Sequence, residues 1–424
     1  MKHINLLFVS LLIFVCSNNS IAQEHDGEFT IKTQLRTRGE YRNGALLPRS
    51  EGDLPASFIS NRARISLGYD NDFLSIGVSG QNVSVWGSRP QIENKGDFAL
   101  NEAWARLSHN NFFAQIGRQQ LAYDDDRILG TLDWNQSGSW HDALKLGYED
   151  PNNKLHLILA YNKTSEAILN NQYFAGAQPY KQMQTLWYKY MDNKNFDISF
   201  LLMNLGFESG SVGGIIDGSV GETTYMQTLG TNLSYKINDF NLFGTFYYQT
   251  GKNVADDNIA AYMWAIKGAY AINQQVSLSA GLDYLSGQDD SDKITAFNPL
   301  YGTHHKFYGT MDYFFASAYP SYGLFDKHAS LILKPNDKLT LDLTYHYFSS
   351  DQSIVVHDAD KTGMGSEIDF TFTYKVRPYI TLQGGYSTMF GTEAFDVAKG
   401  GDHSRWQDWG WLSFNINPLI FRSK

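Results

Sequence analysis

Residues 367–376, EIDFTFTYKV, are the stretch that most directly indicates the fold. Apolar or aromatic residues stand at every second position from Ile368 to Val376, and acidic, hydroxyl or basic residues stand between them. A period of two is typical of a β-strand with one apolar and one polar face. Comparable alternation begins at Phe29, Ala63, Leu155, Leu229, Val276 and Leu339. Several apolar faces end in tyrosine, which is typical of lipid-facing strands that end in an aromatic girdle.

The connections between these stretches alternate between short and long. Short turns are expected at 71–72, 110–111, 150–153, 192–195, 238–239, 273–275, 335–337 and 377–378. Longer polar connections are expected at 43–55, 89–97, 124–139, 165–180, 208–222, 253–258, 288–322, 350–364 and 392–404. Short periplasmic turns opposite long outer loops are the asymmetry of a bacterial outer-membrane barrel. The sequence therefore predicts an all-β, antiparallel transmembrane β-barrel of about 18 strands.

The composition is compatible with such a barrel. The chain has 424 residues, of which 15% are aromatic and only 18% charged, and its mean hydropathy is -0.35. It contains no apolar run of about 18 residues that could cross a bilayer as a helix. A soluble β-sandwich or propeller is the alternative fold. It would lack the strict loop asymmetry, and a propeller would show blade repeats of about 40–50 residues, which we do not find.

Residues 1–22 have the three regions of a secretory signal peptide. Lys2 supplies the positive charge, residues 4–15 the apolar core, and a small-x-small cleavage site ends at Ala22. We therefore expect residues 23–424 to form a single barrel domain in the outer membrane of a bacterial cell.

Basic residues are concentrated in the first strands, although the net charge of -10 argues against nucleic acid as a partner. The residues that alternate with the apolar ones along each strand would line the lumen. Pore-lining, anion-binding candidates are Arg36, Arg38, Arg62, Arg64, Glu102, Arg106, Arg118, Arg127 and Lys145. The arginines of the first two strands could form a basic wall suited to carboxylates or phosphates. Equally, they could pair with acids inside the lumen and hold the shape of the barrel.

Arg118 falls in register with the lipid-facing residues of its strand. A cation at the bilayer midplane is unfavourable. Either a bulge at Gly117 turns the side chain of Arg118 into the lumen, or Arg118 lies near the outer rim.

No cofactor, metal or catalytic site is predicted. The acidic loops, such as the one at Asp124, lack the ligand spacing of a calcium loop, and His304-His305 lacks partners at zinc-site spacing. No serine-centred motif accompanies His156 or His346. We therefore expect no enzymatic activity, with an outer-membrane hydrolase as a rival interpretation.

Residues 117–130, GRQQLAYDDDRILG, resemble the strand-into-loop block of the alginate export outer-membrane porins. The likeness extends to Trp134, 140–143, 365–369 and 384–387. Residues 297–309 are similar to the long loop of the family's marine, Bacteroidetes-type members. The resemblance implies a monomeric, eighteen-stranded barrel with an arginine-lined pore for a uronate polymer. It places Glu102, Arg106, Arg118 and Arg127 in or beside matching blocks. The lack of arginine between Arg127 and Arg377 departs from a pore that is basic all round.

The leading interpretation is a passive outer-membrane channel, or porin, for anionic poly- or oligosaccharides, with alginate-like uronates as the expected class. Its partners would be outer-membrane lipid and lipopolysaccharide, the saccharide, and periplasmic export or uptake proteins. The connection 288–322 is long enough to fold into the mouth as a constriction or gate. A general anion or oligosaccharide porin is one alternative. Another is a surface glycan-binding barrel whose aromatic residues stack on sugars, with Trp134, Trp140, Tyr301 and Tyr308 as candidates.

Overall fold

The computed structural model describes most of the chain downstream of the expected signal peptide. The described residues are 27–92, 97–166, 168, 173, 180–192, 194–208, 211–212, 215–216, 222–317, 319 and 321–423. The signal peptide predicted at 1–22 lies outside them. No helix among the described residues is long and apolar enough to span a membrane.

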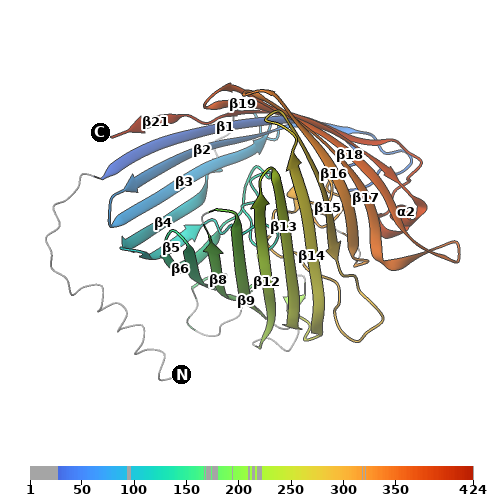
Figure 1. The fold of residues 1–424 in the computed structure, drawn as a ribbon, viewed down its shortest axis with the longest axis horizontal. Helices are drawn as coiled ribbons and strands as arrows, with labels where there is room; N and C mark the ends of the chain where they lie inside the picture. The colour runs from blue at the N-terminus through green and yellow to red at the C-terminus, as the bar shows by residue number, and fades with distance from the viewer. Residues whose placement is uncertain are drawn as a thin grey trace.

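The described residues form one antiparallel sheet that closes on itself (Figure 1). Its strands are β1 (Glu28–Asn43), β2 (Ala56–Asp70), β3 (Leu74–Val85), β4 (Ala99–His109), β5 (Phe112–Gln119), β6 (His141–Glu149), β7 (Asn153–Tyr161), β8 (Gln182–Met191), β9 (Phe196–Glu208), β12 (Thr223–Ile237), β13 (Phe240–Lys252), β14 (Asn258–Ala271), β15 (Val276–Leu285), β16 (Leu324–Asn336), β17 (Leu339–Val356), β18 (Ala359–Arg377), β19 (Ile380–Gly391), β20 (Gln407–Ile416) and β21 (Leu419–Arg422). A separate short hairpin joins β10 (Ser211–Val212) to β11 (Ile215–Ile216).

The barrel closes where the first strand meets the last. β1 pairs with β2 on one side and with both β20 and β21 on the other. Asn417 and Pro418 separate β20 from β21, and proline has no backbone N–H to donate to the ladder. The two segments are therefore one interrupted strand, and the barrel is closed with 18 strands, as the sequence predicts.

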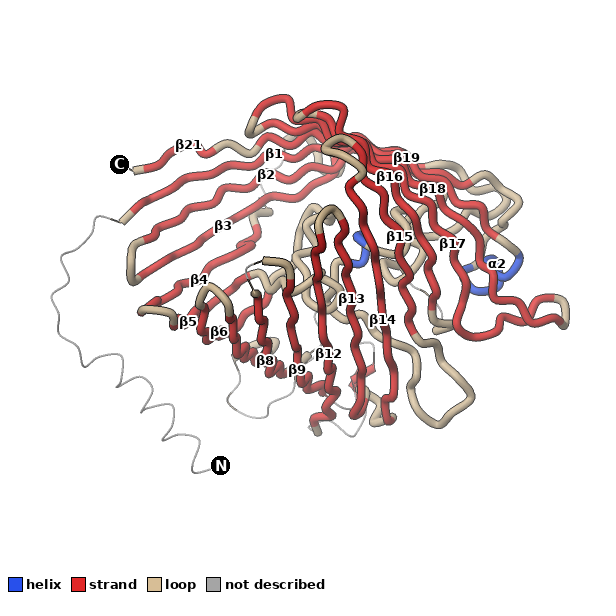
Figure 2. The backbone as a smooth tube through the Cα atoms, viewed as in Figure 1, coloured by secondary structure: helices blue, strands red, loops and turns tan. Residues whose placement is uncertain are grey.

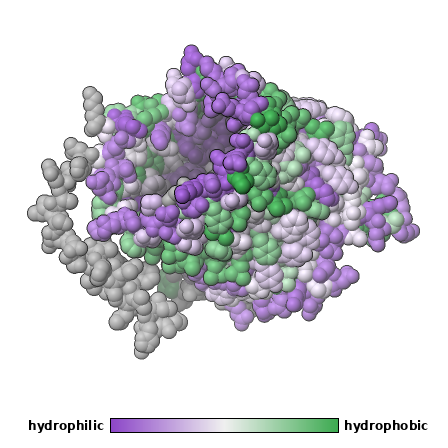
Figure 3. Space-filling view, in the orientation of Figure 1, coloured by the Kyte–Doolittle hydropathy of each residue, from purple (hydrophilic) through white to green (hydrophobic). Residues whose placement is uncertain are grey.

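The two faces of the strands carry the expected alternation. On the outer face, Leu35 of β1 is 45% exposed and Ile65 of β2 is 50% exposed. On the inner face of the same two strands, Arg36 and Arg62 are buried. Exposed leucine and isoleucine are suited to lipid, and the buried arginines require polar partners within the lumen. Hydrophilic side chains border a hollow on the face seen in Figure 3.

All eight short turns lie where the sequence predicts them, but one long connection does not. Residues 350–364 were expected to form a loop. Instead, β17 continues to Val356 and β18 begins at Ala359, so the two strands form a longer paired hairpin. The register of this pair shifts after Phe348. A further difference is the helix α2 (Glu393–Lys399) within the connection 392–404, where Thr392 accepts a hydrogen bond from the Phe395 N–H. Thr392 is a common type of N-cap residue.

Two long connections enter the barrel, which Figure 2 shows as tan segments enclosed by the strands. We call residues 120–140 loop A and residues 286–323 loop B; loop B includes the 3-10 helix η1 (His304–Lys306). Gly130 N–H donates to the Tyr301 carbonyl at 3.0 Å, and Thr303 N–H donates to the Asp126 carbonyl at 2.8 Å. The two loops therefore pair with each other inside the lumen.

The alternation of the faces gives a testable pair of substitutions in β18. Phe370 faces outward and is 39% exposed, whereas Thr371 lines the lumen. Phe370→Lys should lower the free energy of unfolding in lipid vesicles by about 2–4 kcal/mol, because it places a cation in the bilayer. Thr371→Lys should be close to neutral, because its register partner is Asp342. Equal destabilisation in urea titrations would contradict the assignment of the two faces.

Candidate functional site: a lumen narrowed by two loops

The arginines of β1 and β2 hold loop A against the wall. Arg36 and Arg62 bind the two carboxylate oxygens of Asp133 at 3.1 and 2.9 Å. Arg38 donates to the Trp134 carbonyl at 2.9 Å. The side chains of Arg36, Arg38 and Arg62 are 10%, 7% and 1% exposed. Buried guanidinium groups need such partners, so this wall is a docking surface for loop A rather than an open ladder of cations.

The remaining lumen candidates are also bonded within the protein. Arg64 donates to Gln81 at 2.6 Å. Glu102 accepts a hydrogen bond from the Trp104 indole at 3.1 Å. Arg106 lies 3.4 Å from Glu149. Arg106 and Lys145 also lie over the ring of Phe113, at 3.6 and 5.8 Å from its centroid.

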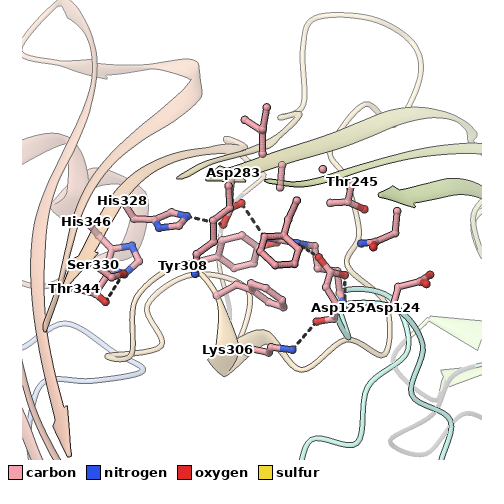
Figure 4. A pocket seen from close by; sticks show the side chains of 18 of the residues that line it. Asp124, Asp125, Thr245, Asp283, Lys306, Tyr308, His328, Ser330, Thr344 and His346 are labelled. Carbon is pink, nitrogen blue, oxygen red and sulfur yellow. Dashed lines mark hydrogen bonds and ion pairs between the residues drawn. The ribbon is translucent and has the colours of Figure 1, made fainter. Parts of the chain in front are cut away.

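Arg127 connects loop A, loop B and the barrel wall. Its guanidinium binds Asp125 within loop A at 2.9 Å and Asp283 of β15 at 2.8 Å. It also donates to the Tyr308 hydroxyl at 3.0 Å and lies 3.8 Å from the centre of the Phe307 ring. Burial raises the pKa of the Tyr308 phenol, so Tyr308 stays neutral beside the cation. Figure 4 shows this junction beside the open cavity.

Loop B is attached by buried acids to β18, which lies three strands from β1 across the closure of the barrel. Met311 N–H donates to Glu367 at 2.8 Å, and the Thr310 hydroxyl donates to Asp369 at 2.5 Å. Glu367 and Asp369 are 0% and 3% exposed. Within loop B, burial lowers the pKa of His304 below its usual range. Loop B enters the lumen, as the length of the connection 288–322 allows, whereas the entry of loop A was not foreseen.

The assignment of Arg118 to the pore lining is wrong. Arg118 lies on the outer face, where both carboxylate oxygens of Asp142 bind it at 3.0 Å. Gly117 has a φ of +120°, but the register of β5 with its neighbours does not shift, so no bulge turns Arg118 inward. Its guanidinium lies 4.3 Å from the centre of the Trp140 ring. Trp140, a candidate for stacking on surface glycans, therefore belongs to this outer cluster, where the Arg118 guanidinium covers its ring.

The other aromatic candidates are also occupied by protein contacts. Trp134 stacks on His305 at 4.1 Å and lies 3.9 Å from the Arg38 guanidinium. Tyr301 and Tyr308 are buried, at 9% and 2% exposure. None of these rings offers a sugar an open stacking face. Sequence reasoning missed Asp133, Thr310 and Met311, for which the long loops were the only signal.

The open space lies beside this junction and measures about 700 Å³. Its lining contains both charge signs and hydroxyl groups, namely Arg127, Lys189, Lys267, Lys306, Asp124, Asp125, Asp197, Asp283, Asp342, Asp369, Ser234, Thr245, Thr310, Ser330, Thr344 and Thr371. Lys189 and Lys306 have acidic partners, Asp197 at 3.3 Å and Asp126 at 3.1 Å. Lys267 is exposed to this space. The arrangement provides charged and hydroxyl contacts for a passing solute.

Comparisons with known proteins agree with this architecture. The family model described as "Alginate export" matches residues 28–406. No curated protein matches the chain. Among solved structures, OccAB1 of Acinetobacter baumannii has a TM-score of 0.61 at 15% identity, over 95% of this chain and 99% of that one. OccAB4 of the same organism has a TM-score of 0.63 at 12% identity, over 95% and 100%. OpdK of Pseudomonas aeruginosa, solved with vanillate, has a TM-score of 0.60 at 12% identity, over 92% and 98%.

The solved structures support the barrel, and the family match covers most of the strands that form the lumen. Family membership together with the barrel indicates a channel in the bacterial outer membrane rather than an enzyme. The chain therefore belongs to the alginate export family of outer-membrane β-barrel porins.

Proposed function

We propose that the protein is a passive channel for anionic poly- or oligosaccharides, with alginate-like uronates as the class that fits best. The observation that supports this most strongly is the binding of one carboxylate, Asp133, by both Arg36 and Arg62. The Asp133 side chain is 54% exposed but Arg36 and Arg62 are 10% and 1% exposed, so a uronate carboxylate would reach this arginine clamp by displacing Asp133. Two guanidinium groups are well suited to a carboxylate, and a polyuronate carries that group on every sugar.

The lysines of the cavity would supply further contacts along the path. A uronate approaching Lys189, Lys267 or Lys306 would exchange water and counterions for a charge-assisted hydrogen bond. The acidic neighbours of two of these lysines keep each contact weak. Conduction requires such weak binding, because a solute held strongly at one position would block the pore.

A general oligosaccharide or anion porin is the second candidate. The cavity carries Asp197 and Asp342 as well as lysines, and its hydroxyl groups could bond neutral sugars. This mixed lining favours a broader substrate range than the arginine clamp alone would suggest.

Block of single-channel current in planar bilayers tests the preference for uronates. Oligouronates should block the current at lower concentration than neutral oligosaccharides of the same length. In the double variant Arg36→Gln and Arg62→Gln, this preference should fall about tenfold or more, because charge-assisted hydrogen bonds are lost. The ratio of the two blocking concentrations is the measured quantity, since release of loop A could change conductance for both sugars.

Arg377→Gln provides the matched control. Arg377 is an exposed arginine at the end of β18 near the short turns, away from the clamp. The control should keep the wild-type ratio. Equal block of the wild-type channel by charged and neutral sugars would reject uronate preference and favour the general porin.

The attachment of loop B predicts that its acids limit the opening. Glu367→Ala together with Asp369→Ala removes the acceptors for Met311 and Thr310. Each lost hydrogen bond should weaken the attachment of loop B to β18 by about 0.5–1.5 kcal/mol. We expect larger unit conductance or more frequent current steps in single-channel recordings.

The control for this variant is Asp342→Ala, because Asp342 lines the same cavity but bonds to Thr344 rather than to loop B. It should leave the current steps unchanged. Unchanged recordings in the double variant would mean that loop B does not limit conduction.

A further inference from the structure

The outer face of β16 carries a cation that the channel function does not explain. Asp326 and His328 face the lumen, where Asp326 is fully buried and bonded to His346, so Lys327 between them faces outward. None of the described carboxylates lies within ion-pair distance of the Lys327 ammonium. Arg118, the outward cation discussed above, is instead bound by Asp142. A lipid-facing cation is unfavourable in the hydrocarbon and is tolerated near the headgroups.

The contacts of Lys327 direct its ammonium toward the outer surface. Nζ donates to the Ser349 hydroxyl at 3.2 Å and lies 4.3 Å from the centre of the Phe325 ring. Ser349 and Phe325 are register partners, and Phe325 is the next outward-facing residue of β16 from Lys327 toward loop B. The Phe325 ring also contacts Trp264 and Tyr284, at 5.9 and 6.0 Å between centroids. The ammonium therefore lies at an aromatic cluster on the side of the long loops, which is the outer leaflet side.

Immediately next to Lys327, on the membrane side, the surface of the barrel is hollowed. Gly268, Ala280 and Ala329 are register neighbours on three successive strands, and Tyr345 follows them on the fourth. These four residues are shared by two adjoining apolar hollows of about 450 and 610 Å³, and Lys327 lines the first. The hollows are therefore continuous, with a cation at one end.

We propose that this surface binds one molecule of lipopolysaccharide through its lipid A part. A phosphate of lipid A would accept hydrogen bonds from Lys327, and one acyl chain would lie in the hollows beside Ala280 and Ala329. Charge complementarity supports this occupant, because the ammonium has no carboxylate partner among the described residues and lies on the side of the outer leaflet, where an anionic headgroup would neutralise it. The apolar hollows account for the acyl chain, since a lipid tail in them avoids a void at the protein surface.

Native mass spectrometry of the refolded full barrel in detergent, titrated with diphosphorylated lipid A, tests the site. The wild type should retain one lipid A molecule. Lys327→Gln should weaken this binding about tenfold through loss of a charge-assisted hydrogen bond, and Lys327→Arg should restore it. Ala329→Leu should also weaken binding, because it fills the hollow while leaving the charge in place. The heat-dependent gel shift of each variant confirms that it is folded.

Two controls separate this site from general lipid association. Lys361→Gln, on the exposed outer part of β18 and outside the hollows, should bind lipid A as the wild type does. Lipid A stripped of its phosphates should bind the wild type as weakly as intact lipid A binds Lys327→Gln. The proposal is overturned if Lys327→Gln and Ala329→Leu both retain wild-type affinity. It is also overturned if phosphatidylethanolamine binds as tightly as lipid A.

Discussion

The structure depends on the requirement that every backbone N–H and C=O within the membrane be hydrogen-bonded. A sheet meets this requirement only when it has no free edge, and the pairing of β1 with β20 and β21 removes the edge here. Closure then divides each strand into a lipid side and a lumen side. The apolar alternation of the sequence is the direct consequence, and so is the concentration of arginines and acids in the interior.

The polar interior in turn determines where the long loops go. Arg36 and Arg62 on one wall, and Glu367 and Asp369 on another, are too buried to be satisfied by bulk water alone. Loop A supplies a carboxylate and carbonyls to the arginines, whereas loop B supplies N–H and hydroxyl donors to the acids. Each wall is thus matched to the loop that it binds. Arg127 joins both loops to β15, so the narrowing of the lumen is one connected structure.

The sequence permits prediction of the strands and short turns because their signals are local. The alternation and the turn residues located all eight short turns. The position of Arg118 in the alternation of its strand also placed it correctly with the lipid-facing residues. The expected loop at 350–364 is wrong because a polar sequence outside the membrane can still pair as strands. The family resemblance was confirmed by the match over residues 28–406.

The docking of the loops could not be predicted, because it depends on contacts between residues far apart in the chain. Arg36 and Asp133 meet across almost a hundred positions, and no local pattern links them. For the same reason, the sequence could not show that His305 stacks on the ring of Trp134, which was predicted to stack on sugars. The alternative in which the early arginines pair inside the lumen describes Arg36, Arg38 and Arg62 better than an open basic ladder does.

The reversal potential of single wild-type channels under a potassium chloride gradient tests the central claim most directly. The lysines of the cavity, and Lys267 above all, should favour anions in the narrowed lumen, because the arginines of the wall are already paired with acids of the protein. We therefore expect a reversal potential on the chloride side of zero, smaller in Lys267→Glu, which reverses a charge exposed to the cavity. A reversal potential on the potassium side in the wild type would contradict it.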